Sequence, residues 1–218
     1  MIASSRWFPS WRRALQAAVA LLFLAPVGGA LADEPVVLVF GDSLSAAYGF
    51  DRDQAWPVLV EQRMEEAGLP HRVVNTSRSG ETTSGGLRRL PETLERHEPE
   101  LLVLQLGGND GLRGQPPERV QENLAHMLEK AQERGAQVLL LGIRIPPNYG
   151  RTYTERFEAI YPDLAERYGV ALIPFMLEGI WNQDGMMQDD GIHPTAEAQP
   201  KIADKVWETL QEMLDAPS

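Results

Sequence analysis

An apolar run gives way to a polar turn at residues 36–45, which read Val36-Val37-Leu38-Val39-Phe40-Gly41-Asp42-Ser43-Leu44-Ser45. Five successive apolar residues, three of them β-branched, predict a strand buried on both faces, because a half-buried strand would alternate with polar residues. Gly41 permits a tight turn, and the side chains of Asp42 and Ser43 can accept from the backbone N–H groups that follow. We therefore expect a serine hydroxyl at the carboxyl end of a central parallel strand, where open α/β sheets bind ligands.

Strands and helices alternate along the rest of the chain. Further apolar runs predict strands at residues 71–75, 101–106, 138–143 and 170–173. Apolar residues at helical spacing predict helices at residues 56–67, 87–97, 118–134, 153–168 and within 197–214, with a break at Pro91. This alternation is typical of the α/β class, here a single three-layer α/β/α sandwich with a parallel central sheet.

Residues 1–32 are predicted to be a secretory signal peptide that is removed. Three arginines precede the apolar run at residues 17–25, and Ala30-Leu31-Ala32 is the small-residue pattern of a cleavage site. The run is shorter than the ~20 apolar residues that span a bilayer, so no stable membrane anchor is expected. Residues 33–218 are then predicted to form a single domain that is periplasmic or secreted.

The composition narrows the range of partners. The 218 residues carry a net charge of −11. Three of the 20 basic residues and none of the 31 acidic residues lie in the predicted signal peptide, which leaves 17 − 31 = −14 for the remainder. A polyanion would be repelled, so no nucleic acid partner is expected. The absence of cysteine excludes disulfides, thiol catalysis and cysteine metal ligands.

Three loops are expected to meet at one edge of the sheet, because the carboxyl ends of parallel strands lie together. The loops after the first three strands contain Ser43, Gly80 and Asn109. Acyl transfer needs donors aimed at a developing oxyanion, and candidates are the Ser43 N–H at the start of a helix, the Gly80 N–H and the Asn109 amide. Each residue alone is more typical of turn geometry. Their occurrence after three successive strands favours an oxyanion hole.

His193 is the best candidate for a base among the four histidines. A serine hydroxyl needs a base to take its proton, and that base is most often an imidazole. His193 lies in a loop before Pro194, and Asp190 is three positions earlier. In a turn, this spacing lets the carboxylate reach Nδ1 while Nε2 faces the serine. The sequence thus predicts a triad of Ser43, Asp190 and His193.

These segments resemble the four sequence blocks of the SGNH, or GDSL, hydrolases. The blocks are Gly41-Asp42-Ser43-Leu44-Ser45, Gly80, Gly107-Gly108-Asn109-Asp110 and Asp190-Gly191-Ile192-His193-Pro194. The match is similar in detail to the periplasmic thioesterases, lysophospholipases and arylesterases of bacteria. The resemblance implies a flavodoxin-like sheet order, the triad and oxyanion hole named above, and hydrolysis of acyl esters and thioesters without a cofactor.

A groove for the acyl group of a small ester or thioester substrate is expected at the same edge. Its predicted substrate-binding residues are Leu112, Ile145, Pro146 and Tyr149, with Trp181, Met186 and Met187 as further apolar candidates. We expect the segment 111–114, a loop with glycine at each end, to shift when an acyl chain binds. The protein is expected to act as a monomer.

Two other classes of function remain open at this point. The side chains of Asp42, Asn109, Asp110, Asp189, Asp190 and His193 are possible ligands of a metal-dependent phosphoesterase. That site would contain one histidine and leave Ser43 without a role. A non-catalytic periplasmic protein that binds acyl chains would need the groove but not the triad.

Overall fold

The computed structural model describes Met1 and residues 34–215. Its centre is a sheet of β1 (Val36–Gly41), β2 (Arg72–Asn75), β3 (Leu101–Gln105), β4 (Gln137–Leu141) and β5 (Ala171–Ile173). All neighbouring strands are parallel and their order is β2-β1-β3-β4-β5. This is the flavodoxin-like order, so the predicted fold class is confirmed.

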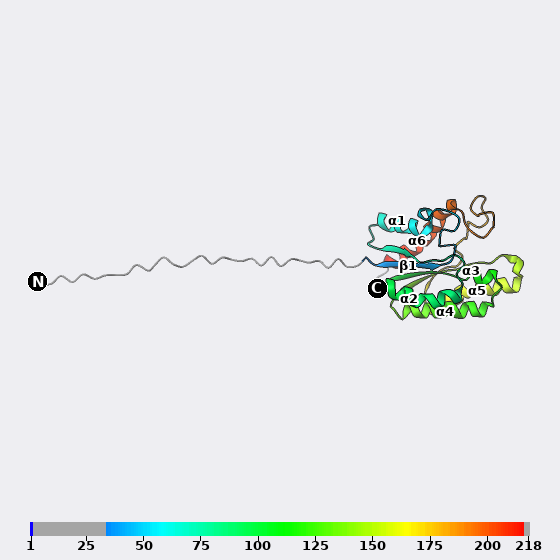
Figure 1. The fold of residues 1–218 in the computed structure, drawn as a ribbon, viewed down its shortest axis with the longest axis horizontal. Helices are drawn as coiled ribbons and strands as arrows, with labels where there is room; N and C mark the ends of the chain where they lie inside the picture. Colours follow the sequence, from blue (N-terminus) through cyan, green and yellow to red (C-terminus); the bar gives the residue numbers. More distant parts are fainter. Residues whose placement is uncertain (2–33, 216–218) are drawn as a thin grey trace. The chain divides into compact units, whose positions relative to one another are not determined.

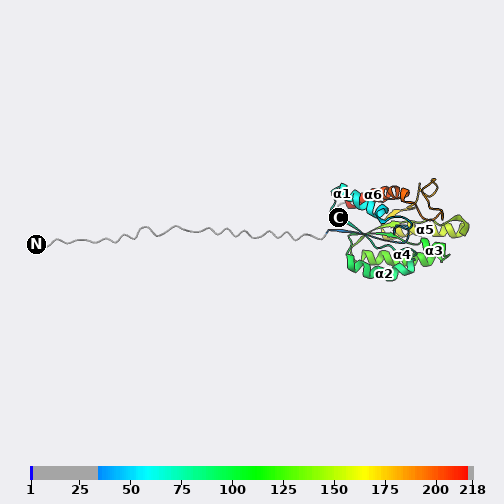
Figure 2. The ribbon, with the colours of Figure 1, turned by 45° about the horizontal axis from the view of Figure 1, so that its top comes forward.

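Helices cover both faces of the sheet (Figures 1 and 2). On one face lie α1 (Trp56–Glu66) and α6 (Gln199–Asp215). On the other lie α2 (Thr83–His97), α4 (Pro117–Gln132) and α5 (Arg151–Tyr168). The shorter elements are α3 (Gly108–Leu112) and the 3-10 helices η1 (Arg52–Gln54), η2 (Pro147–Tyr149) and η3 (Ala196–Ala198).

The side chains of β1 alternate between two apolar layers, one on each face of the sheet. Leu38 and Phe40 pack with the side of the sheet that α2, α4 and α5 cover, whereas Val37 and Val39 pack with the α1 and α6 side. All six residues of β1 are buried. The strand is therefore buried on both faces, as its unbroken apolar run predicts.

The predicted break at Pro91 is absent, because α2 runs without interruption from Thr83 to His97. Leu90 and Leu94 on either side of the proline are fully buried in the core, and this packing holds both halves of the helix against the sheet. The helix also begins four residues earlier than predicted. Its start is capped by the Thr82 hydroxyl, which accepts from Gly85 N at 3.2 Å. The other predicted elements agree with the structure to within two residues at each end.

The helix predicted to begin at Ser43 is also absent. The segment 43–49 forms successive turns, with Ser45 N donating to Asp42 O and Ala46 N donating to Ser43 O. Ala47 has a φ of 58°, which takes the chain out of a right-handed helical path. The Ser43 N–H is thus held by a tight turn and not by a helix terminus.

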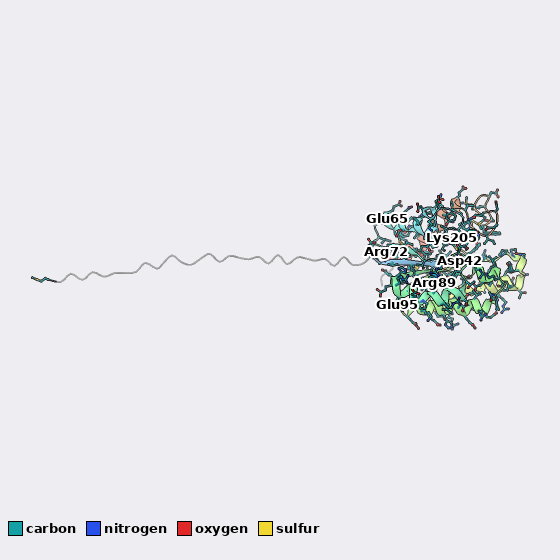
Figure 3. The ribbon with its side chains drawn as sticks, viewed as in Figure 1. Asp42, Glu65, Arg72, Arg89, Glu95 and Lys205 are labelled. Carbon is teal, nitrogen blue, oxygen red and sulfur yellow. The ribbon has the colours of Figure 1, made fainter. Side chains whose placement is uncertain are left out.

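The carboxyl end of the sheet gathers the predicted site residues. Arg72, at the start of β2, and Asp42, just after β1, lie toward opposite ends of the sheet (Figure 3). Apart from Met1, the predicted signal peptide lies outside the described residues. No helix in the described part of the chain has both the length and the apolar character needed to cross a membrane.

Candidate active site

His193 lies between Ser43 and Asp190. Its Nε2 atom is 2.9 Å from Ser43 Oγ, and its Nδ1 atom is 2.6 Å from Asp190 Oδ2. An ionised carboxylate only accepts hydrogen bonds, so Nδ1 carries the imidazole proton and Nε2 can accept from the serine hydroxyl. The structure therefore brings the three predicted triad residues into one hydrogen-bonded chain.

A tight turn holds Asp190 in place beneath the imidazole. Its Oδ1 atom accepts from the backbone N–H of Ile192 at 2.9 Å and of His193 at 3.0 Å. Partial burial raises the pKa of Asp190, but these hydrogen bonds and the contact with the His193 ring outweigh burial and lower the pKa to about 2. The carboxylate is consequently ionised throughout the neutral range and can orient Nδ1–H.

A buried polar network fixes the turn that carries Ser43. Asp42 Oδ1 accepts from Leu44 N and from Gln105 Nε2, both at 3.0 Å. Gln105 Oε1 in turn accepts from Asp42 N at 3.2 Å and from Ser45 Oγ at 2.7 Å. A Cβ atom on Gly41 would lie 2.6 Å from Gln105 Oε1, so only glycine lets the glutamine approach. Gln105 was not predicted as a site residue, although its place as a polar residue at the end of a buried apolar strand was a signal for such a role.

Asn109 is joined to the same network. Its Nδ2 atom donates to Asp42 Oδ2 at 3.3 Å, which leaves the second N–H of the amide free for a ligand. Burial raises the pKa of Asp42 to about 6, while hydrogen bonds from Leu44, Gln105 and Asn109 and the nearby His193 oppose that rise. Asn109 and Ser43 both line the large cavity at this edge.

Gly80 lies beside the end of α3 and is not among the residues that line the cavity. Its carbonyl oxygen accepts from Arg113 Nη2 at 3.3 Å, and its φ of 79° is in the left-handed region. Close by, Asp110 is buried and accepts from both the backbone N–H and the hydroxyl of Thr83 at 2.8 Å. These contacts tie the loop after β2 to the loop after β3, as the parallel topology requires.

The cavity next to Ser43 has a volume of about 480 Å³. Of the predicted groove residues, those that line it are Leu112, Ile145, Pro146, Trp181 and Met187. Tyr149 does not line it, because its hydroxyl donates to Leu112 O at 2.7 Å and the ring packs on the core. Met186 is buried in the core on the α1 and α6 side of the sheet. Residues of the loops after β4 and β5 complete the wall, among them Ile143, Arg144, Phe175 and Leu177.

Two further features of the site were not expected from the sequence. Arg144 places a charge on an otherwise largely apolar wall, where it donates to Glu178 Oε2 at 3.0 Å and lies over the Phe175 ring. The Tyr48 ring stacks on the His193 imidazole with 4.3 Å between centroids, although the tyrosine is 47% exposed. Tyr48 directly follows Ala47, whose positive φ of 58° turns the chain at this point. This backbone conformation could not be predicted from the sequence.

Three of the acidic side chains considered as metal ligands are already engaged by hydrogen-bond donors. Asp42 accepts from Leu44, Gln105 and Asn109, Asp110 accepts from Thr83, and Asp190 accepts from its own turn. In the described residues, no group of three or more histidine, aspartate or glutamate side chains is arranged to hold a metal ion. The donor set therefore does not fit the metal site considered above.

Comparison with known proteins identifies the family of the chain. Residues 39–199 match the model of the GDSL-like Lipase/Acylhydrolase family. Esterase TesA of Pseudomonas aeruginosa is 52% identical over 178 residues, which are 82% of this chain and 89% of the relative. Thioesterase 1/protease 1/lysophospholipase L1 of Escherichia coli K12 is 43% identical over 197 residues, which are 90% of this chain and 93% of the relative.

A solved structure shares the fold as well as the sequence. The psychrotrophic esterase EstA from Pseudoalteromonas sp., inhibited by monoethylphosphonate, superposes with a TM-score of 0.79 at 36% identity. The match covers 83% of this chain and 99% of the EstA chain. The sequence blocks, the parallel sheet and these similarities lead to one assignment. The chain belongs to the GDSL-like lipase and acylhydrolase family.

Proposed function

We propose that this protein is a serine hydrolase that cleaves acyl esters and thioesters through an acyl-enzyme. The observation that carries the proposal is the 2.9 Å contact between Ser43 Oγ and His193 Nε2 beside an apolar cavity. Membership of a lipase and acylhydrolase family supports the same chemistry. The reaction needs a nucleophile, a base, an orienting acid and oxyanion donors, and no cofactor.

In the first half-reaction, Ser43 Oγ attacks the carbonyl carbon of the substrate as its proton moves to His193 Nε2. Asp190 stabilises the imidazolium that forms, because its carboxylate holds Nδ1–H at 2.6 Å. The tetrahedral intermediate then collapses, and the leaving oxygen or sulfur takes the proton from Nε2. In the second half-reaction, His193 Nε2 takes a proton from a water molecule as the water attacks the acyl carbon. The bond between Ser43 Oγ and the acyl carbon then breaks, Oγ takes the proton back from Nε2, and the free acid is released.

The developing negative charge on the carbonyl oxygen needs fixed donors. We assign this role to the second Nδ2–H of Asn109 together with the backbone N–H groups of Ser43 and Gly80. The first two come from residues that line the cavity, and the loop of Gly80 is tied to α3 by Arg113. Backbone donors in a tight turn cost no reorganisation during the reaction, which is why such a site lowers the barrier.

The acyl group would lie against Leu112, Ile145 and Pro146 in the cavity. A volume of about 480 Å³ suits an extended acyl chain, and the apolar wall would exclude water from it. The names of the relatives, esterase and thioesterase 1/protease 1/lysophospholipase L1, support esters, thioesters and lysophospholipids as the substrate classes. The arginines, alanines and apolar run of residues 6–32 support export to the periplasm or the medium.

A hydrolysis panel tests the proposal. Wild type and Ser43→Ala would be assayed on p-nitrophenyl esters and acyl-CoAs of graded chain length, with and without a chelator. We expect turnover of both substrate classes that is insensitive to the chelator and lost in Ser43→Ala. Binding of acyl chains without turnover would instead identify a carrier, and loss of activity with the chelator would identify a metal-dependent enzyme.

A further inference from the structure

A buried chain of hydrogen bonds, here called the buried bridge, joins the segment that carries Ser43 to the segment that carries Asp190 and His193. None of the three triad side chains takes part in it. The Ser43 turn is here residues 42–49, and the His193 loop is residues 186–195. Trp56 Nε1 donates to Leu44 O in the Ser43 turn at 3.2 Å. Trp56 N donates to Gln199 Oε1 at 3.1 Å, and Gln199 Nε2 donates to Thr195 O in the His193 loop at 3.1 Å.

Both side chains of this bridge are completely buried, since Trp56 and Gln199 have 0% relative exposure. The first backbone N–H groups of a helix lack partners within the helix, and the Gln199 amide satisfies that of Trp56 at the start of α1. Water cannot replace a partner that is lost at such a position, so each hydrogen bond is costly to break. The bridge therefore fixes the spacing between the Ser43 turn and the His193 loop.

A second bridge joins the same two segments at the surface. Gln188 Nε2 donates to Tyr48 O at 2.9 Å and to Pro194 O at 3.0 Å, while Gln188 N donates to His193 O at 2.8 Å. A Cβ atom on Gly49 would lie 2.5 Å from Gln188 Oε1, so glycine is needed for the side chain to cross the turn. Gln199 thus binds the His193 loop on its buried side, and Gln188 binds it on its exposed side.

We propose that Gln199 and Gln188 are positioning residues that keep His193 in place when Ser43 no longer holds it. The inference rests on the proposed function, in which Ser43 becomes acylated. In the free enzyme the serine hydroxyl contacts Nε2 directly. In the acyl-enzyme Ser43 Oγ has no proton to donate, yet His193 must stay in place to activate water. The bridges bypass the triad, so they persist through both half-reactions.

The consequence is that loss of a bridge slows deacylation more than acylation. Acylation begins with the direct hydrogen bond between Ser43 and His193 in place, whereas in deacylation that bond is gone and His193 is held by Asp190 and by the bridges. We expect kcat to fall about tenfold to 10²-fold in a bridge variant, because sub-ångström to 1 Å misplacement of a catalytic group costs that much. KM should fall with kcat, since slower deacylation lowers both. The acyl-enzyme should therefore accumulate, and its formation should be seen as an initial burst of the first product.

The variants and their controls can be matched closely. Gln188→Met removes the exposed bridge, and Gln132→Met removes the same kind of amide-to-carbonyl bond, to Tyr168 O, far from the site. Gln199→Met removes both hydrogen bonds of the buried glutamine at similar side-chain length. Trp56→Phe removes the donor to Leu44 O together with part of the buried ring, and it keeps the buried bridge testable if Gln199→Met does not fold. Its control is Trp207→Phe, a partly buried residue of the same apolar layer.

The experiment is stopped-flow release of p-nitrophenol from a p-nitrophenyl ester, with the folded fraction of each variant measured by circular dichroism. An increased burst amplitude and a reduced kcat in Gln188→Met and in Gln199→Met, or in Trp56→Phe where Gln199→Met does not fold, with wild-type kinetics in both controls, would support the proposal. Bridge variants with wild-type kinetics, or with rates that fall only with the folded fraction, would overturn it. A wild type that does not turn over the ester, or an active Ser43→Ala, would overturn the proposed function instead.

Discussion

Asp42 is a buried carboxyl group whose two oxygens both serve the site. Oδ1 holds the Ser43 turn through Leu44 and Gln105, and Oδ2 holds the Asn109 amide. All of these partners are donors, so the network suits the ionised carboxylate, whereas burial opposes that form and raises the pKa to about 6. The residue thus orients two parts of the candidate site at a cost in folding free energy.

That cost predicts a pH dependence of stability. Asp42 has a pKa of about 6 in the folded protein and 3.8 when unperturbed, so between these values the folded state keeps a proton that the unfolded state has lost. Its contribution to the free energy of unfolding is full below about pH 4 and falls as pH rises through 6, by roughly 3 kcal/mol in all. Asp42→Asn lacks this change. Urea unfolding at several pH values should show the wild type losing stability relative to Asp42→Asn from pH 4 to 7, and a constant difference would contradict the assignment.

Asn109 allows a test of the oxyanion hole. If its amide donates to the tetrahedral intermediate, Asn109→Ala should lower kcat by about 10²- to 10³-fold, or ~2.7 to 4 kcal/mol, with KM little changed. Asn109→Asp keeps the size, removes the donor and adds a negative charge, so it should be at least as damaging. The assay is steady-state ester hydrolysis beside thermal unfolding. An active Asn109→Asp enzyme would refute the role.

The candidate acid and base could be predicted from the sequence, because aspartate and histidine have few chemical roles at such positions. Asp190 and His193 share one turn, so their contact depends on local geometry alone. Gln199 could not be found in this way, because a glutamine fits many environments and its partners are far away in the chain. For Gln105 the only signal was its place at the end of a buried apolar strand, which does not name its partners. The roles of both glutamines depend on how β3 and α6 pack against the Ser43 turn.

At the scale of elements, tertiary contacts decide where α2 begins and how α3 is held. Thr83 at the start of α2 donates to the buried Asp110 of α3, an interaction that no pattern in either segment reveals. The segment 111–114 is likewise not the free loop that its glycines predicted. Gly111 and Leu112 belong to α3, and a Cβ atom on Gly111 would lie 2.4 Å from Ile145 Cγ2. The movement expected of this segment on acyl binding remains a prediction.

The contact between α2 and α3 can be tested with one substitution at two positions of the same helix. Thr83→Val removes a hydroxyl that donates to the buried Asp110 carboxylate and accepts from Asn123 Nδ2 at 3.0 Å, so it should lower the free energy of unfolding by ~1 to 3 kcal/mol. Thr93→Val removes only a hydroxyl bond to Arg89 O within the helix and should change stability far less. Urea unfolding at pH 7 compares them. Equal losses would show that the Asp110 contact has no special importance.

At the scale of the whole molecule, the parallel sheet explains why distant residues meet. Alternating apolar runs predicted the topology, and the topology places the loops after β1 and β3 at the same edge. The cavity was less predictable. More than half of its wall comes from the segments after β4 and β5, where Arg144 and Phe175 have no sequence pattern that sets them apart from surface or core residues. The shape of that wall depends on packing between loops.

The central claim is that Ser43 is the nucleophile of an acyl-enzyme mechanism. The most direct measurement is mass spectrometry of the whole protein and its peptides after reaction with a p-nitrophenyl phosphonate ester. Ser43 Oγ should displace p-nitrophenol, giving one adduct per chain, located on Ser43, whose formation parallels the loss of ester hydrolysis. Continued hydrolysis by protein fully labelled at Ser43, or complete inactivation with Ser43 unmodified, would contradict the claim.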